Sequence, residues 1–289
     1  MIPTVNFHLI KACNYKCKFC YATFNDIHVK SMTRSEQLEL IELLAKSKLF
    51  RKINFAGGEP TLVPHITDLI KHAKSLGFET SIVTNVSRID FNWVKEISPY
   101  LDILTMSIDS INDDTNIRIG RNQSGKTNKI DKLEEIAKAC HTFGVNLKIN
   151  TVVSAFNVSE DLSFFINQLN PFRWKIFQVT KVEGQNDKYF ESLKIDNEEF
   201  NYFCERNQKH ISPNTKVVVE SEEIIRGSYL MIDQLGRFFD DSNQIHNYSD
   251  KILKIGVHNA LQQIEIDVNK FEIREGNYTT IKNDKLCTF

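Results

Sequence analysis

Short runs of β-branched and apolar residues alternate along the chain with segments of helical periodicity. Six runs have the length and composition of strands, and they cover residues 5–10, 52–57, 80–85, 101–109, 145–153 and 173–179. Six strand–helix units in succession predict parallel strands joined by helical crossovers. Because eight units close a barrel, six predict a curved, partly open one.

Two helices between these strands are marked by the sequence. Thr33 and Glu36 have the spacing of a capping box, which predicts a helix start at this point. The segment 128–143 places Ile130, Leu133, Ala137 and Cys140 on one helical face. These helices are expected to cover the strands as crossovers.

The alternation changes at about residue 185. A helix is predicted over 197–208, and β-rich stretches follow at 216–221 and 228–241. We therefore expect an α/β fold in which residues 1–184 form a partial (βα)6 TIM-like barrel. Residues 185–289 are expected to form an α+β extension that covers the open side or the bottom of that barrel.

Composition narrows the class of protein. The net charge of −1 argues against a polymeric nucleic acid as partner. The sequence contains no run of about 20 apolar residues, so no membrane-spanning helix is predicted. The first residues lack a charged segment followed by an apolar one, so no secretory signal is expected. Six cysteines in 289 residues are too few for a disulfide scaffold, which predicts a cytoplasmic protein. Because neither a membrane span nor a secretory signal is predicted, no membrane attachment is expected.

Three of the cysteines lie together in the sequence CNYKCKFCYATF, at Cys13, Cys17 and Cys20. They follow the first strand, at the face where barrels build their sites. Cys140 and Cys204 fall on apolar helix faces and are expected in the core. Cys287 is near the C-terminus and stays open as a fourth ligand.

Three chemistries use thiols at such spacing. A structural zinc site normally has four protein ligands, and a thioredoxin-type motif needs only two cysteines in another context. A 4Fe-4S cluster with three thiolate ligands leaves one iron open for a substrate or cofactor. The aromatic Phe19 before Cys20 and the position after a strand favour the cluster.

The motif Cx3CxΦC after strand one, followed by GGEP at 57–60 after strand two, resembles the radical S-adenosylmethionine (SAM) superfamily. A glycine pair lets a backbone approach a ligand closely. The resemblance implies a 4Fe-4S cluster on Cys13, Cys17 and Cys20, with SAM bound at the open iron. It implies cofactor-binding roles for ten further residues, namely Phe19, Tyr21, Gly57, Gly58, Glu59, Thr84, Asn85, Ser107, Arg121 and Val153.

Longer stretches resemble the viperin family of radical SAM enzymes, among them NFHLIKACNYKCKFC, KINFAGGEP, IGRNQSGK, NPFRWKIFQ and SYLMIDQLGRF. The resemblance implies conversion of a ribonucleoside triphosphate (CTP, UTP or GTP) to its 3′-deoxy-3′,4′-didehydro form. A 5′-deoxyadenosyl radical takes the C4′ hydrogen, and the 3′-hydroxyl leaves as water. The electron donor is expected to be a reductase or a flavodoxin- or ferredoxin-type protein. The amphipathic membrane helix of vertebrate members has no counterpart before the first strand.

Basic residues on three strands support an anionic substrate independently. By strand alternation, Lys52, Lys148, Arg173 and Lys175 lie opposite the apolar face that packs on the helices, so they are expected to point into the barrel. Unpaired buried charge is costly, so four enclosed cations call for an anion such as a triphosphate. The alternative is that each cation pairs with a carboxylate or ends in solvent. No GxxxxGK[ST] loop is present.

Further residues carry narrower expectations. By resemblance, Asn6 and Tyr229 are expected to contact the substrate, and Asn150, which faces inward, is expected to do so too. Lys52 and Tyr229 are the expected catalytic residues, with Lys52 assisting loss of hydroxide. His8 is expected to be a hydrogen-bonded core histidine. Asp240 and Asp241 are expected in a solvated loop. Two alternatives stay open: a radical SAM enzyme acting on a peptide or another nucleotide, and a non-enzymatic iron–sulfur protein.

Overall fold

The computed structural model describes residues 2–278 and 280. The six predicted strands are confirmed to within one or two residues at each end. They are β1 (Thr4–His8), β2 (Lys52–Ala56), β3 (Glu79–Thr84), β4 (Ile103–Ser107), β5 (Asn146–Val153) and β6 (Arg173–Gln178).

Helices connect these strands, as the alternation predicts. They are α1 (Arg34–Ser47), the 3₁₀ turn η1 (Pro60–Leu62), α2 (Ile66–Ser75), α3 (Phe91–Ile97), α4 (Asp113–Arg118), α5 (Ile130–Phe143) and α6 (Ser163–Leu169). The capping box at the start of α1 is confirmed, because Thr33 and Glu36 each accept a hydrogen bond from the other's backbone N–H.

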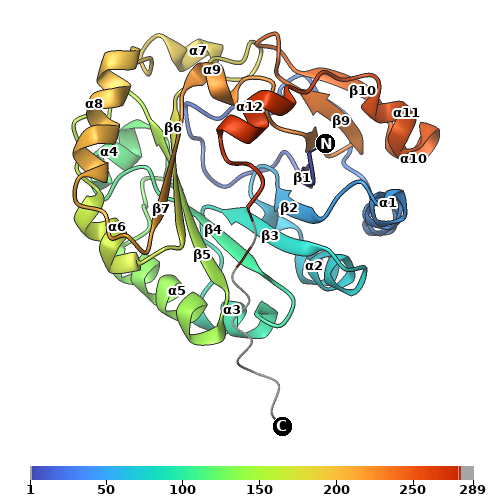
Figure 1. The fold of residues 1–289 in the computed structure, drawn as a ribbon, viewed down its shortest axis with the longest axis horizontal. Helices are drawn as coiled ribbons and strands as arrows, with labels where there is room; N and C mark the ends of the chain where they lie inside the picture. The colour runs from blue at the N-terminus through green and yellow to red at the C-terminus, as the bar shows by residue number, and fades with distance from the viewer. Residues whose placement is uncertain (1, 279, 281–289) are drawn as a thin grey trace.

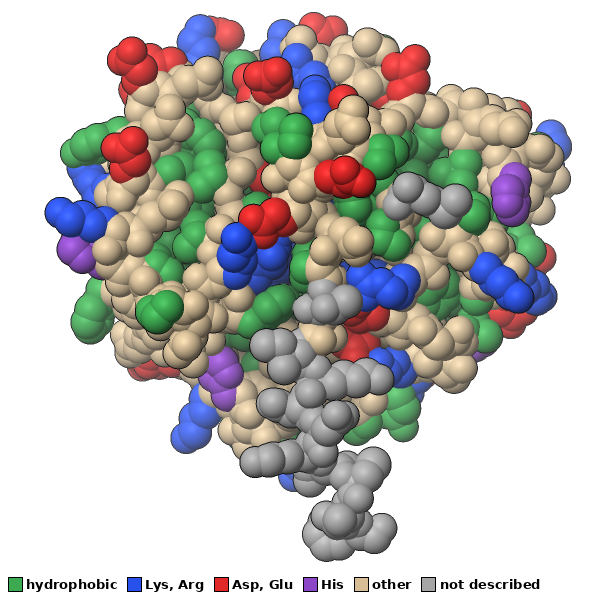
Figure 2. Space-filling model, in the orientation of Figure 1, with side chains coloured by type: hydrophobic (Ala, Val, Ile, Leu, Met, Phe, Trp, Pro, Cys, Tyr) green, Lys and Arg blue, Asp and Glu red, His purple; other side chains and the backbone are tan. Residues whose placement is uncertain are grey.

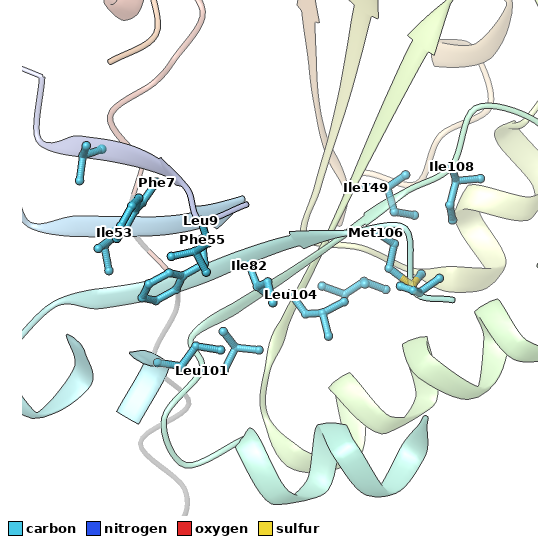
Figure 3. Packing of buried hydrophobic residues seen from close by; sticks show 14 of the residues in the cluster. Phe7, Leu9, Ile53, Phe55, Ile82, Leu101, Leu104, Met106, Ile108 and Ile149 are labelled. Carbon is cyan, nitrogen blue, oxygen red and sulfur yellow. The ribbon is translucent and has the colours of Figure 1, made fainter. Parts of the chain in front are cut away.

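Among the described residues, ten strands form one sheet in the order β10-β9-β8-β1-β2-β3-β4-β5-β6-β7. Strands β1 to β6 are parallel, as crossover connections require. The helices lie outside the curved sheet (Figure 1). Figure 3 shows Phe7, Ile53, Phe55 and Leu104, which are buried in the core between the sheet and these helices. The expected α/β partial barrel is confirmed.

The C-terminal region adds strands to both edges of this sheet. Its elements are α7 (Asp187–Phe190), α8 (Asn197–Gln208), β7 (Lys216–Glu220), α9 (Glu222–Ile225), β8 (Met231–Ile232), β9 (Arg237–Asp240), β10 (Asn247–Lys251), α10 (Ile252–Ile255), α11 (Val257–Leu261) and α12 (Val268–Ile273). Strand β7 pairs with β6, and β8 pairs with β1. The extension is therefore continuous with the barrel sheet, and the division after residue 184 stays a proposal.

The segment that follows α12 runs across the open side of the barrel, between β7 and β1 (Figure 1). Arg173 on β6 donates a hydrogen bond to the carbonyl of Glu275, and Lys52 on β2 donates one to the carbonyl of Tyr278. The end of the described chain thus touches strands on both sides of the opening.

The surface carries charges of both signs. Figure 2 shows acidic and basic side chains interspersed on one face, which agrees with the near-zero net charge. In the part of the chain that the structure describes, no helix is both long and apolar enough to cross a membrane.

Candidate active site

One cavity of about 640 Å³ lies inside the barrel. Its size is typical of sites for small molecules and cofactors. The three neighbouring cysteines, the GGE segment and the inward side chains of β1, β2 and β5 all line it. The predicted iron ligands and four of the predicted substrate residues, Asn6, Lys148, Asn150 and Tyr229, therefore line a single enclosure.

The loop that carries the cysteines is held by backbone hydrogen bonds on two sides. On one side Glu59 N donates to Ala12 O over 2.9 Å. On the other side Lys16 N donates to Gly120 O over 3.1 Å, and Lys18 N donates to Ile119 O over 2.8 Å. The thiols therefore sit on a fixed backbone rather than on a free loop.

Glycines permit this clamping. A Cβ on Gly58 would lie 2.2 Å from Ala12 O, and one on Gly120 would lie 2.1 Å from Lys16 O. We expected the glycine pair of GGEP to let the backbone approach a ligand. The close approach in the structure is to the chain's own cysteine loop, and Gly120, which sequence reasoning missed, has the same role.

The three cysteines are free thiols that line the cavity. Burial raises the pKa of Cys17 to about 12 and that of Cys20 to about 11 in the metal-free chain. A bound cation is therefore needed to stabilise the thiolates.

Three thiols that line one cavity are the donor set of a 4Fe-4S cluster in which one iron stays open for a ligand. The residues present therefore fit such a cluster. Cys140 and Cys204 are buried in the core as expected, and Cys287 lies outside the described residues.

Glu59 organises the strand ends beside the cysteines. Its carboxylate accepts hydrogen bonds from Thr84 Oγ1 (2.7 Å) and Asn85 N (2.8 Å), and also from the backbone and hydroxyl of Thr61. The resemblance implies that Glu59 binds SAM, and this role stays a proposal. In the structure Glu59 lines the cavity, and its hydrogen bonds also fix Thr84 and Asn85, which line the cavity too.

Ser107 and Arg121 line the cavity as predicted, together with Phe19 and Tyr21. The Arg121 guanidinium pairs with the buried Asp109 and donates to Ser107 O over 3.3 Å. Val153 differs from the expectation, because it is buried in the hydrophobic core while its neighbour Val152 lines the cavity. Successive side chains on a strand point to opposite faces, so we no longer propose a Val153 side-chain contact.

The four predicted cations are buried inside the barrel, but three are paired, so the premise of four unpaired cations is wrong. Lys52 Nζ lies 3.2 Å from Glu79 Oε1, Arg173 Nη2 lies 3.6 Å from Glu275 Oε2, and Lys175 pairs with the fully buried Glu220. Carboxylates from β3, β7 and the C-terminal segment supply the partners, and sequence alternation on each strand does not reveal them.

Lys148 is the exception. It has no ion pair with a described carboxylate, and of the four cations it is the one that lines the cavity among the described residues. Burial lowers the pKa of Lys148 to about 7, and the nearby Arg173 and Lys52 add to this effect, while Glu220 opposes it. An anion in the cavity would restore its charge.

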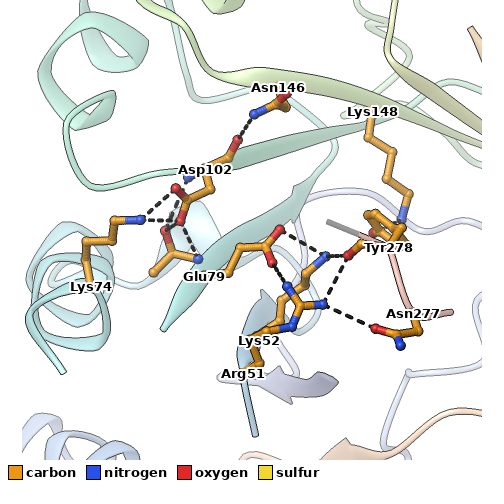
Figure 4. Close-up of polar contacts among 10 residues, drawn as sticks. Arg51, Lys52, Lys74, Glu79, Asp102, Asn146, Lys148, Asn277 and Tyr278 are labelled. Atoms are coloured by element: carbon orange, nitrogen blue, oxygen red, sulfur yellow. Dashed lines mark hydrogen bonds and ion pairs between the residues drawn. The ribbon is translucent and has the colours of Figure 1, made fainter. Parts of the chain in front are cut away.

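Figure 4 shows Tyr278 between Lys52 and Lys148. Its ring centroid is 3.7 Å from Lys52 Nζ and 4.3 Å from the Arg173 guanidinium carbon, and its hydroxyl is 3.4 Å from Lys148 Nζ. These contacts are cation–π interactions and a weak hydrogen bond. Nothing in the strand pattern indicated that this tyrosine reaches the barrel interior.

Three asparagines form the polar wall between the thiols and the cations. Asn54 Nδ2 donates to Asn6 Oδ1 over 2.8 Å, and Asn6 Nδ2 donates to Leu230 O over 3.1 Å. Asn54 Oδ1 and Asn150 Oδ1 are buried without a partner, and both residues line the cavity. Buried acceptors of this kind call for a donor, such as a hydroxyl group of a bound molecule.

Tyr229, two residues before β8, also lines the cavity. Its hydroxyl donates to Glu220 Oε2 over 2.6 Å, and the Arg274 guanidinium carbon lies 3.6 Å from its ring centroid. Burial raises the pKa of Tyr229 well above its ordinary value, so its hydroxyl stays protonated.

Two expectations about polar residues are wrong. His8 is buried, but neither ring nitrogen has a hydrogen-bond partner, and burial lowers its pKa to about 3. It lines the cavity as a neutral imidazole. Asp240 and Asp241 are buried rather than solvated, and Asp241 Oδ1 accepts from Gly227 N over 2.9 Å.

Comparison with known proteins decides the family. Residues 8–162 match the model of the radical SAM superfamily. The chain is 42% identical over 287 residues to the S-adenosylmethionine-dependent nucleotide dehydratase of Flammeovirga pacifica, with 96% of each chain covered. The chain belongs to the S-adenosylmethionine-dependent nucleotide dehydratases of the radical SAM superfamily.

A second member of this dehydratase family, from Lacinutrix mariniflava, is 43% identical over 294 residues. The match covers 99% of this chain, which spans 60% of the length of that relative. The fold is also that of solved radical SAM structures: native anSMEcpe with bound AdoMet has a TM-score of 0.67 at 14% identity, covering 98% of this chain and 86% of that one. Members of the superfamily use a 4Fe-4S cluster and SAM, which the residues of this cavity fit.

Proposed function

We propose that this nucleotide dehydratase converts a ribonucleoside triphosphate to its 3′-deoxy-3′,4′-didehydro form. The observation that carries the proposal is the cavity itself. It joins three thiols at one end, a lysine without a carboxylate partner toward the other, and unsatisfied asparagine oxygens between them. This order of groups matches a molecule with a triphosphate at one end and ribose hydroxyls in the middle.

Cys13, Cys17 and Cys20 would hold the cluster, and the strand ends organised by Glu59 would border SAM. When bound, the cluster and SAM supply the 5′-deoxyadenosyl radical that takes the C4′ hydrogen of the ribose. The chain's own contribution is to place the ribose and to exclude water. Loss of the 3′-hydroxyl as water then consumes one proton, and one further electron completes the product.

Lys148 would bind the triphosphate, with Lys52, Arg173 and Lys175 as the paired cations around it. Asn6 and Asn150 would contact the ribose. We take Tyr229 and Lys52 as the candidate proton donors for the departing hydroxyl; Lys52 is buried in the barrel and Tyr229 is partly buried. Of the two, Tyr229 lines the cavity directly.

We infer CTP, UTP or GTP as substrate and a flavodoxin- or ferredoxin-type protein, or a reductase, as electron donor. We also infer a reducing compartment such as the cytoplasm, because the three thiols must stay reduced to bind iron.

The test is an anaerobic assay of the reconstituted protein with SAM, dithionite and each of the four ribonucleoside triphosphates. We expect at least one nucleotide to stimulate 5′-deoxyadenosine formation and to yield a product lighter by one water. Stimulation by a peptide alone, or SAM cleavage that no nucleotide changes, would contradict the proposal. Cys140→Ala, Cys204→Ala and Cys287→Ala should each retain full iron content, and loss of iron in any of them would reveal a fourth protein ligand.

A further inference from the structure

A group of cations and aromatic rings lies at the rim of the cavity, and the proposed function assigns no role to these residues. It consists of Lys18 from the cysteine loop, Arg118 at the end of α4, Phe156 after β5, and Lys188 and Tyr189 on α7. We call these five residues the rim patch. Lys18, Lys188 and Tyr189 line the cavity that holds the three thiols.

The rim patch is held together by cation–π contacts. The Arg118 guanidinium carbon lies 4.4 Å from the Phe156 ring centroid, and Lys188 Nζ lies 5.1 Å from that of Tyr189. Lys18 Nζ lies between the two rings, 5.7 Å from Phe156 and 5.8 Å from Tyr189. Four segments that are distant in sequence therefore converge on one surface beside Cys17.

The cations of the rim patch have one carboxylate beside them in the sequence, Asp187 on α7, and they form no ion pair with it. None of them forms an ion pair with a described carboxylate. The neighbouring Asp113 and Glu191 pair instead with Lys129 and Lys194. On a chain whose net charge is −1, three unpaired cations at one place form a local positive field. Tyr189 is 40% exposed, so an aromatic side chain is also available there.

We propose that the rim patch is the docking surface for an acidic, low-potential one-electron carrier protein of the flavodoxin or ferredoxin type. The proposal rests on the proposed function, which needs single electrons delivered at the cysteine end of the cavity. Exposed Arg and Tyr are the residues that dominate protein interfaces, and opposite charge steers association of the partners. The carrier gives one electron per encounter and leaves oxidised by one electron.

The test compares a protein reductant with a chemical one. In Arg118→Glu/Lys188→Glu the charge of the patch is reversed, while Lys18, which adjoins a cysteine ligand, is kept. The control, Lys95→Glu/Lys138→Glu, makes the same change in net charge on exposed lysines of α3 and α5. Abortive SAM cleavage without nucleotide is the activity readout, so the outcome does not depend on the substrate being identified correctly.

With dithionite we expect both double variants to cleave SAM within twofold of the parent rate. With flavodoxin kept reduced by its reductase, or with reduced ferredoxin, we expect kcat/KM for the carrier to fall at least tenfold in the patch variant only. The affinity for oxidised flavodoxin, measured by biolayer interferometry, should also fall at least tenfold in the patch variant and not in the control. Raising salt from about 50 to 300 mM should slow the carrier-driven parent reaction and leave the patch variant nearly unchanged, because exposed charges are screened.

Several outcomes would overturn the proposal. They are equal carrier-driven rates in parent and patch variant, failure of both carriers to drive the parent, or an equal loss in the control variant. A rise in nucleotide KM with dithionite would show that the patch steers the substrate instead. If dithionite-driven SAM cleavage is normal but no nucleotide stimulates it, the proposed function fails while the docking result stands by itself.

Discussion

The two ends of the cavity are built by different means. At the cysteine end, a backbone hydrogen bond donated by Glu59 and one accepted by Gly120 fix a loop whose thiols need a cation. At the opposite end, long basic side chains are fixed by carboxylates such as Glu79 and Glu220. The first end is rigid before any ligand binds. At the second end three of the four cations are paired, and among the described residues Lys148 is the one of the four left for an incoming anion.

The difference matters because the ends meet different ligands. A cluster must be held at a fixed position, which suits a clamped backbone. A substrate must enter and leave at every turnover, and a set of four unpaired cations would hold a triphosphate too tightly and would cost much stability when empty. Because three of the four cations are paired with carboxylates, the triphosphate is held less tightly and the free protein loses less stability.

The largest predicted effect is the loss of iron when the cysteine loop is displaced. Gly120→Ala places a Cβ 2.1 Å from Lys16 O, so the loop must shift and iron content should fall several-fold, with loss of SAM cleavage. Gly125→Ala is the matched control, because Gly125 has nearly the same φ (+80° against +83°) and open space around it. Both variants pay the left-handed strain of about 1 kcal/mol, so only the clash differs. Equal iron content in the two variants would contradict a clamped loop.

The second effect tests the pairing at the cationic end. Lys175→Met leaves Glu220 buried beside Tyr229 without its closest cation, and we expect the free energy of unfolding to fall by about 3–5 kcal/mol. Urea denaturation of the metal-free chain measures this. Lys175→Met/Glu220→Gln should recover most of the loss, since the amide still accepts from Tyr229. Unchanged stability of the single variant would mean that the pair is not buried as described.

The two ends also differ in how far sequence predicts them. Cys13, Cys17 and Cys20, the GGEP segment and the strand order follow from local spacing and periodicity, and the structure brings them together as expected. The inward direction of Lys148 and Asn150 follows from alternation along one strand. Which carboxylate faces which cation depends on registry between strands far apart in the chain, such as Lys175 on β6 and Glu220 on β7.

Two features of the site could not be predicted from local sequence patterns. Tyr278 reaches Lys52 only because the segment after α12 crosses the open side of the barrel. Gly120 looks like an ordinary turn glycine, and only its packing against Lys16 O gives it a role. For His8 and Asp241 the local sequence led to a wrong expectation. Polar residues near a strand end are usually hydrogen-bonded or exposed to solvent, but both residues are buried here and the ring nitrogens of His8 have no partner.

The third effect separates substrate binding from SAM chemistry. Lys148→Met keeps the bulk of the side chain but removes the charge that has no carboxylate partner. We expect triphosphate affinity to weaken by about 2 kcal/mol or more, with little loss of folding stability, which is the reverse of Lys175→Met. The measurement is nucleotide-stimulated 5′-deoxyadenosine over a range of nucleotide concentrations. Basal SAM cleavage should not change, and a retained apparent affinity would place the phosphate site elsewhere.

The smallest effect is a pH dependence that belongs to Lys148 alone. Its pKa is lowered to about 7 in the empty cavity, mainly by burial and further by Arg173, Lys52 and Arg274, while Glu220 opposes the shift. A bound triphosphate raises that pKa again, so the complex holds more protons than the free protein between the two values. Affinity should therefore be flat below about pH 7 and fall above it, by at most about tenfold per pH unit.

Nucleotide affinity at pH 6.5, 7.5 and 8.5, in the parent and in Lys148→Met, measures this dependence. The triphosphate itself also titrates in the lower part of this range, but it does so equally in both proteins, so the difference between the two profiles isolates the lysine. If the two profiles are parallel, Lys148 is already charged before the nucleotide binds. It must then have a partner of opposite charge that is not among the ion pairs of the described residues. If they diverge as expected, the cationic end takes up a proton with its ligand, whereas the cysteine end must release protons to bind iron.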